Sequence, residues 1–127
     1  MVIAITPKQT FDHILKCDSN EPPEKQTRWK LRALTLDEQA SVRDATLRAD
    51  RATQQFAVNS GRVELMRLRW GLMGVENFVD SAGSPVKFEK VDGLVPDEFL
   101  ARISAEHRAE LSIAIANLGE VTAAEGN

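Results

Sequence analysis

Apolar and polar residues alternate with a period of two along residues 26–34. One face carries Trp29, Leu31 and Ala33, and the other face carries Arg28, Lys30 and Arg32. This period is typical of a strand with one buried face. A weaker alternation covers Phe11–Lys16, and the tandem prolines between the two segments suit neither a helix nor a central strand. We therefore predict two antiparallel strands joined by a long polar loop, with Trp29 and Leu31 packed on the helices that follow.

Two helices are predicted after these strands. Thr35 and Glu38 fit a capping box, in which the threonine hydroxyl accepts a bond from a first-turn N–H and the glutamate reaches back to the cap. We expect this first helix to run from Thr35 to about Ala57. Asn59-Ser-Gly61 is rich in turn-forming residues and is predicted to break the helix. The second helix is then expected from about Arg62 to Met73.

The predicted second helix is apolar around more than one side. Val63, Met66, Trp70 and Met73 form one stripe, and Leu65, Leu68 and Leu72 form another. A helix with such wide apolar coverage is either central to the core or in contact with a partner. Core packing is the first interpretation, and a partner-binding or self-association surface is the alternative. The residues of that hypothetical surface are Leu65, Met66, Leu68, Trp70 and Met73.

The C-terminal half combines a turn-rich segment with further helices. Residues 77–89 hold turn-forming residues between apolar ones, so we expect a short hairpin or an ordered loop docked on the helices. Pro96 is expected at the first position of a short helix, because proline suits that position. Ser104 is then expected to cap the last helix and Gly119 to end it.

These patterns together predict one domain over residues 1–127. We expect it to be ordered from about residue 8 to 118, with a flexible tail at 119–127, because the last residues are small and polar. The predicted fold class is α+β. It is mainly helical, with about four helices, a small N-terminal antiparallel β element and the short hairpin or loop near residues 77–89.

Composition adds limits on location and class. The chain has 127 residues, of which 43% are hydrophobic and 28% charged, as is ordinary for one globular domain. Its one cysteine, Cys17, excludes an internal disulfide scaffold. There is no secretory signal pattern, and no apolar run approaches the ~20 residues needed to cross a bilayer. We therefore expect a cytoplasmic protein that does not enter a membrane.

The residues that could carry chemistry are few and scattered. His13 and His107 lie far apart in the sequence and fit no metal-ligand spacing, and Cys17 has no histidine placed to activate it. No glycine pattern resembles a phosphate-binding loop. The sequence therefore predicts no enzyme activity, no catalytic residue, no metal site and no cofactor.

Charge leaves one competing hypothesis, a small nucleic-acid-binding regulator. Residues 25–69 carry a balance of +5 and residues 70–127 a balance of −6, and Trp29 interleaves with the basic residues of its strand. Aromatic residues in a basic groove often hold single-stranded nucleic acid. However, Trp29 would point away from those charges, and the pI of about 5.4 argues against phosphate binding.

The order of segments along residues 10–118 adds a further indication. The extended segment Phe11–Lys16 and a Pro-Glu-rich loop lead into Thr27–Glu38, where a Leu-Thr pair precedes the first helix. Later, Gly74-Val-Glu-Asn-Phe-Val-Asp leads through a Gly-Ser-Pro-Val-Lys-Phe turn to the last helices. This order resembles the tail assembly chaperones of long-tailed, siphovirus-like bacteriophages, and the run Gly74–Phe88 is the most distinctive part of the resemblance.

The resemblance implies a viral assembly protein that acts in the host cell cytoplasm. Such chaperones bind the hydrophobic tape measure protein, assist polymerisation of the tail tube protein around it, and are absent from the mature virion. They have no catalytic residues. Two other classes stay open, a structural head–tail or tail-tip protein of a phage and the nucleic-acid-binding regulator, and self-association into a homo-oligomer stays open as well.

Overall fold

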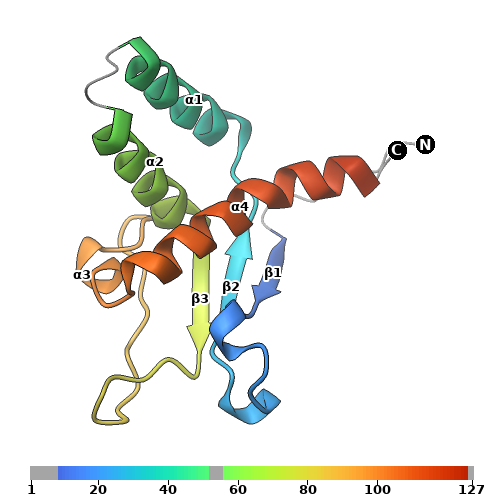
Figure 1. Ribbon diagram of the computed structural model, residues 1–127, viewed down its shortest axis with the longest axis vertical. Helices are drawn as coiled ribbons and strands as arrows, with labels where there is room; N and C mark the ends of the chain where they lie inside the picture. The colour runs from blue at the N-terminus through green and yellow to red at the C-terminus, as the bar shows by residue number, and fades with distance from the viewer. Residues whose placement is uncertain (1–8, 52–55, 126–127) are drawn as a thin grey trace.

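A three-stranded antiparallel sheet with the order β1-β2-β3 forms one layer of the protein (Figure 1). The computed structural model describes residues 9–51 and 56–125, with the side chains of 9–46 and 61–118. β1 (Thr10–His13) pairs with β2 (Arg28–Arg32), and β2 pairs with β3 (Leu72–Glu76). Between β1 and β2 the chain forms two short 3-10 helices, η1 (Lys16–Asp18) and η2 (Pro23–Lys25). The predicted antiparallel pair of N-terminal strands is therefore confirmed, although β1 ends before Lys16.

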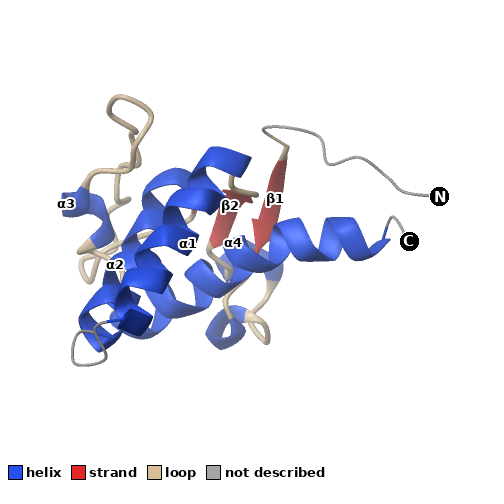
Figure 2. Cartoon of the chain, turned by 90° about the horizontal axis from the view of Figure 1, so that it is seen from above, coloured by secondary structure: helices blue, strands red, loops and turns tan. Residues whose placement is uncertain are grey.

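Four α-helices accompany this sheet in the described part of the chain. α1 (Leu36–Arg51) and α2 (Phe56–Gly71) lie side by side above the sheet, followed by the one-turn helix α3 (Asp97–Leu100) and the long helix α4 (Ala105–Glu125). α4 runs along one side of β1 and β2, and its C-terminal turns extend past β1 (Figure 2). Helices and an antiparallel sheet in separate parts of one small domain confirm the predicted α+β class.

The core lies between β2, α2, α3 and α4. Trp29 and Leu31 of β2 are each 1% exposed, which confirms the apolar face predicted for this strand. They pack with the other large buried side chains, Leu68, Leu72, Val95, Leu100, Leu111 and Ile115. Phe78 links this core to the loop that follows β3, because its ring lies 5.0 Å from that of Trp29 and 5.9 Å from that of Phe99.

The capping box at the start of α1 is confirmed. The Thr35 N–H donates to Glu38 Oε1 at 2.9 Å, and the Glu38 N–H donates to the Thr35 hydroxyl at 3.2 Å. Glu38 also accepts two bonds from the Arg32 guanidinium, at 2.8 and 3.0 Å. Burial alone would raise the pKa of Glu38, but the bonds from Arg32 and Thr35 outweigh it and lower the pKa. The box therefore joins the end of β2 to the start of α1.

Two predicted helix boundaries are wrong. Asn59, Ser60 and Gly61 do not break a helix but lie within α2, where a Cβ on Gly61 would meet nothing within 4 Å. A single glycine in a helix weakens it by only about 1 kcal/mol, which tertiary packing overrides. Gly119 likewise does not end α4, which continues to Glu125. The connection between α1 and α2, at residues 52–55, lies outside the described residues.

The boundary between α2 and the following strand is also different from the prediction. α2 ends at Gly71, so that Leu72 and Met73 belong to β3 and not to the helix. A Cβ on Gly71 would lie 2.6 Å from Ile115 Cγ2, so only glycine lets α2 approach α4 this closely. Pro96 is the N-cap of α3 and not its first helical residue, whereas Ser104 caps α4 as predicted by accepting the His107 N–H at 3.4 Å.

Candidate functional site

The sequence-predicted surface on the second helix is largely part of the core. Leu68 is completely buried, and Leu65, Met66 and Trp70 are half-buried against the core cluster. Met73 lies on β3, where its sulfur accepts a bond from Lys90 Nζ at 3.4 Å. Leu68 therefore cannot contact a partner of the folded protein. The half-buried residues keep part of their surface, so their role in partner binding stays a prediction.

Exposed apolar side chains gather instead on the loop between β3 and α3. Val79, Val91 and Leu94 are 47%, 58% and 40% exposed, and they are three of the five large hydrophobic residues exposed in the described part of the chain. Bridges join Val79 to Pro85 and Val91 to Leu94, which give the loop two tight turns. The segment 77–89 is thus a hairpin-shaped loop without regular strands.

A cleft of about 480 Å³ opens between this loop and α3, and we call it the loop–α3 cleft. Its apolar lining is Pro85, Val86, Val91, Pro96 and Phe99, and its charged lining is Asp80, Lys87, Glu89, Glu98 and Arg102. The buried ring of Phe99 forms part of the wall and is held edge-on by Phe88, with ring centroids 5.0 Å apart. An apolar wall with a few polar groups at its rim is typical of a site for a small ligand or a peptide.

The charges around the cleft are mostly paired. Lys87 Nζ lies 3.4 Å from Glu89, and Arg102 lies 4.0 Å from Asp80. The Asp80 carboxylate also accepts the N–H groups of Ala82 and Ser84 at 2.9 and 3.0 Å, which fixes the tip of the loop. Among the described residues the Glu98 carboxylate has no ion-pair partner. The cleft is therefore left with one unbalanced negative charge at its rim.

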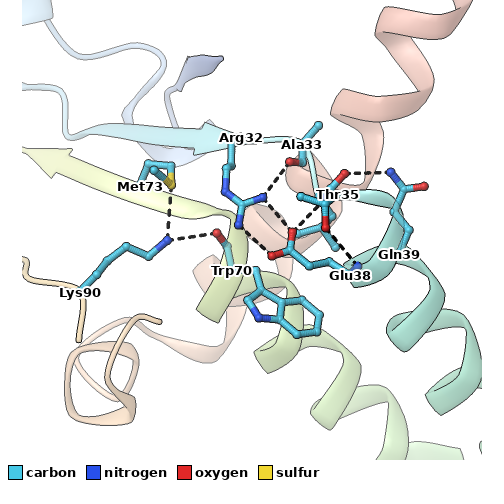
Figure 3. Close-up of polar contacts among 9 residues, drawn as sticks. Arg32, Ala33, Thr35, Glu38, Gln39, Trp70, Met73 and Lys90 are labelled. Atoms are coloured by element: carbon cyan, nitrogen blue, oxygen red, sulfur yellow. Dashed lines mark hydrogen bonds and ion pairs between the residues drawn. The ribbon is translucent and has the colours of Figure 1, made fainter. Parts of the chain in front are cut away.

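Two sets of polar contacts hold the two walls of the cleft, the loop and α3, on the rest of the domain. Lys90 Nζ donates to the Trp70 carbonyl at 3.1 Å, near the end of α2, and also to the Met73 sulfur (Figure 3). Burial lowers the pKa of Lys90, and the nearby Arg32 adds to this effect while Glu38 opposes it. On the other side, the Arg69 guanidinium donates two bonds to Asp97 at 2.9 and 3.2 Å. The cleft is therefore built on a fixed frame.

The basic face of β2 does not form a phosphate-binding groove. Arg28 and Lys30 lie between Asp12 on β1 and Glu76 on β3, with the four nitrogen–oxygen distances between 3.6 and 4.0 Å. The third basic residue of the strand, Arg32, is paired with Glu38, and Trp29 is buried on the opposite face. Since each of these cations has acidic neighbours, the face offers little net charge to a nucleic acid.

The tertiary structure brings together two pairs of residues that the sequence separates widely. His13 Nε2 lies 2.9 Å from Glu110 Oε2, and Cys17 Sγ lies 3.5 Å from His107 Nε2. The contacts span about ninety residues, so no local spacing could have predicted them. Partial burial and the carboxylates of Asp18 and Glu110 raise the pKa of the Cys17 thiol, which opposes formation of the thiolate that a nucleophile needs.

The described residues contain neither a candidate metal site nor a membrane-spanning helix. Among the described residues, no group of three or more His, Cys, Asp or Glu side chains could hold a metal ion. The described helices include none that is both long and apolar enough to cross a membrane. Comparisons with protein-family models, with curated proteins and with solved structures each return no match.

Proposed function

We propose that this protein acts by binding another protein, as a tail assembly chaperone of a long-tailed bacteriophage. Its partner would be the tape measure protein, which it would keep soluble while the tail tube protein polymerises. The observation that carries the binding role is the loop–α3 cleft, which is lined by the exposed Val91 and by four further apolar residues. The resemblance in segment order supplies the identity of the partner.

The cleft suits binding because its frame is already in place. The loop is attached to α2 through Lys90, and the Arg69–Asp97 ion pair attaches α3 to α2. A preformed surface needs little ordering when a partner arrives, so more of the contact energy remains as affinity. The run Gly74–Phe88, the most distinctive part of the resemblance, contains the tip of this loop. A binding function would explain why that segment differs from an ordinary connection.

The chemistry of the described residues also favours binding over catalysis. The single cysteine, Cys17, lies beside His107 but has a raised pKa, and the half-buried ion pair of Arg32 and Glu38 joins β2 to α1. Enzyme sites need an activated nucleophile or a poised acid and base facing a cavity. The loop–α3 cleft is lined instead by carboxylates and cations that mostly neutralise each other.

Co-expression tests this proposal. We expect a phage tape measure protein to remain in the soluble fraction with this chain and to precipitate without it. Val91→Asp should reduce the soluble yield several-fold, because a carboxylate in the apolar lining opposes burial. Leu36→Asp is the matched control, since Leu36 is 83% exposed at the start of α1 and an acid is tolerated there. A tape measure protein that precipitates equally with and without the wild-type chain would refute the proposal.

The residues predicted from the sequence need their own test. Trp70 is half-buried against the core cluster, so Trp70→Ala would remove core packing as well as exposed apolar surface. We expect Trp70→Ala to lower the soluble yield of the partner. Undiminished yield from a folded Trp70→Ala variant would remove Leu65, Met66, Trp70 and Met73 from the binding surface and leave the cleft.

A further inference from the structure

Residues 86–90 run along one side of the cleft and belong to no strand. Residues 86–90 have no regular secondary structure, yet their side chains alternate as in a strand: Val86, Phe88 and Lys90 are half-buried, and Lys87 and Glu89 are exposed. The Val86 N–H donates to the Phe78 carbonyl at 2.8 Å, which fixes one end. Among the described residues, the backbone groups of residues 87–90 make no hydrogen bond. Such a segment is ready to accept another strand.

Side chains from both sides of this segment line the cleft, Val86 from the half-buried side and Lys87 and Glu89 from the exposed side. Lys87, Glu89 and Val91 line it from the loop, and Glu98 and Phe99 line it from α3. A chain that lay along the segment would meet the apolar wall with one set of alternating side chains. The side chains that alternate with these would reach the rim, where the Glu98 carboxylate has no ion-pair partner among the described residues. The vacant pairing edge and the unbalanced charge therefore lie at the same place.

We propose that the loop–α3 cleft binds an extended segment of a partner protein that carries apolar side chains and at least one lysine or arginine. The segment adds as a strand to residues 87–90, with its cation at Glu98. Main-chain bonds provide affinity in this mode of recognition, and alternate side chains provide specificity. This inference rests on the proposed protein-binding role and specifies the chemistry of the partner.

Short synthetic peptides test the inference without a natural partner. The probe is a capped hexapeptide in which valine and lysine alternate. One comparison peptide replaces lysine by glutamate, and another replaces valine by proline, which keeps the charge but removes N–H donors. Binding is followed by chemical-shift changes in the ¹H–¹⁵N spectrum of the whole chain. The variants are Glu98→Gln and Val91→Asp, with Asp44→Asn as a control that removes one exposed carboxylate from α1.

We expect the valine–lysine peptide to shift the amide signals of residues 87–91 and 98–99. Glu98→Gln should weaken its affinity about fivefold, as expected for loss of one exposed ion pair. Added salt should weaken binding to the wild-type chain more than binding to Glu98→Gln. Val91→Asp and the proline peptide should each weaken affinity by more than tenfold, and Asp44→Asn should leave it unchanged.

Three results would overturn the inference: equal binding of the glutamate peptide, equal binding of the proline peptide, or signal changes confined to other parts of the chain. The co-expression assay separates this failure from that of the proposed function. If Glu98→Gln and Val91→Asp retain the tape measure protein as well as the wild-type chain does, the cleft is not its site, although the binding role stands. If the wild-type chain retains no partner, the proposed function itself fails.

Discussion

The contact between Gly71 and Ile115 provides a sharp test of how α2 packs on α4. Gly71 is the last residue of α2, and a Cβ added there would lie 2.6 Å from Ile115 Cγ2 and 2.8 Å from Cδ1. Ile115 is 1% exposed and branched at Cβ, so it has little freedom to move away. Overpacking a tight core destabilises a protein by about 1–3 kcal/mol. Helix propensity would return less than about 1 kcal/mol at a helix end.

We therefore expect Gly71→Ala to lower the free energy of unfolding by about 1–2 kcal/mol. Gly61→Ala is the matched control in the same helix, because a Cβ at Gly61 meets nothing within 4 Å. That change should raise stability by about 0.5–1 kcal/mol through helix propensity alone. Urea unfolding followed by tryptophan fluorescence gives both values, and the two substitutions should move the midpoint in opposite directions.

A double-mutant cycle would assign the effect to this contact. In an Ile115→Ala background the three crowding atoms are gone, so Gly71→Ala should no longer destabilise the protein. The interaction energy should then be about 1–3 kcal/mol. The reasoning about close helix approach would be refuted if Gly71→Ala stabilised the protein as Gly61→Ala does, or if the two sites proved additive.

Three further predictions concern the capping box, the core and the thiol. Glu38→Gln should destabilise the protein by about 2 kcal/mol at neutral pH, because it weakens the charged bonds from Arg32. The lowered pKa of Glu38 means that its contribution is complete above pH 4.5 and is lost as the pH falls through the folded-state pKa, so wild-type and variant stabilities measured by urea unfolding should converge in acid. Leu68→Ala should lower the unfolding free energy by about 3–5 kcal/mol, since Leu68 is fully buried, and a loss under 1 kcal/mol would contradict its place in the core. Cys17 should react with iodoacetamide at pH 7 more slowly than glutathione does, because its pKa is raised, and a faster reaction would show an activated thiol.

The parts of the fold that were predicted correctly depend on residues that are close together in the sequence. The alternation around Trp29 and Leu31 and the capping box of Thr35 and Glu38 each depend on residues within a few positions, and the structure confirms both. Helix ends were predicted less well. Gly61 and Gly119 resemble stops locally, but one glycine disfavours a helix by only about 1 kcal/mol, and both residues lie within helices.

The candidate site could not be predicted from local sequence patterns. The surplus of apolar residues on the second predicted helix suggested a surface there, but Leu68 and Leu72 are buried in the core. Three of the five exposed large apolar residues, Val79, Val91 and Leu94, lie instead on the loop between β3 and α3, for which the sequence predicted no binding surface. Exposure depends on what remains after the core is filled, and a periodic pattern does not contain that information.

The α+β class, the two N-terminal strands and the capped start of α1 could be predicted from the sequence alone. These follow from side-chain period and from local hydrogen bonding. Three other features could be seen only in the tertiary structure: β3 completes the sheet, Cys17 lies beside His107, and the loop after β3 forms a cleft with α3. Each of these joins residues far apart along the chain. Such contacts are set by how the whole core packs, and no local pattern encodes them.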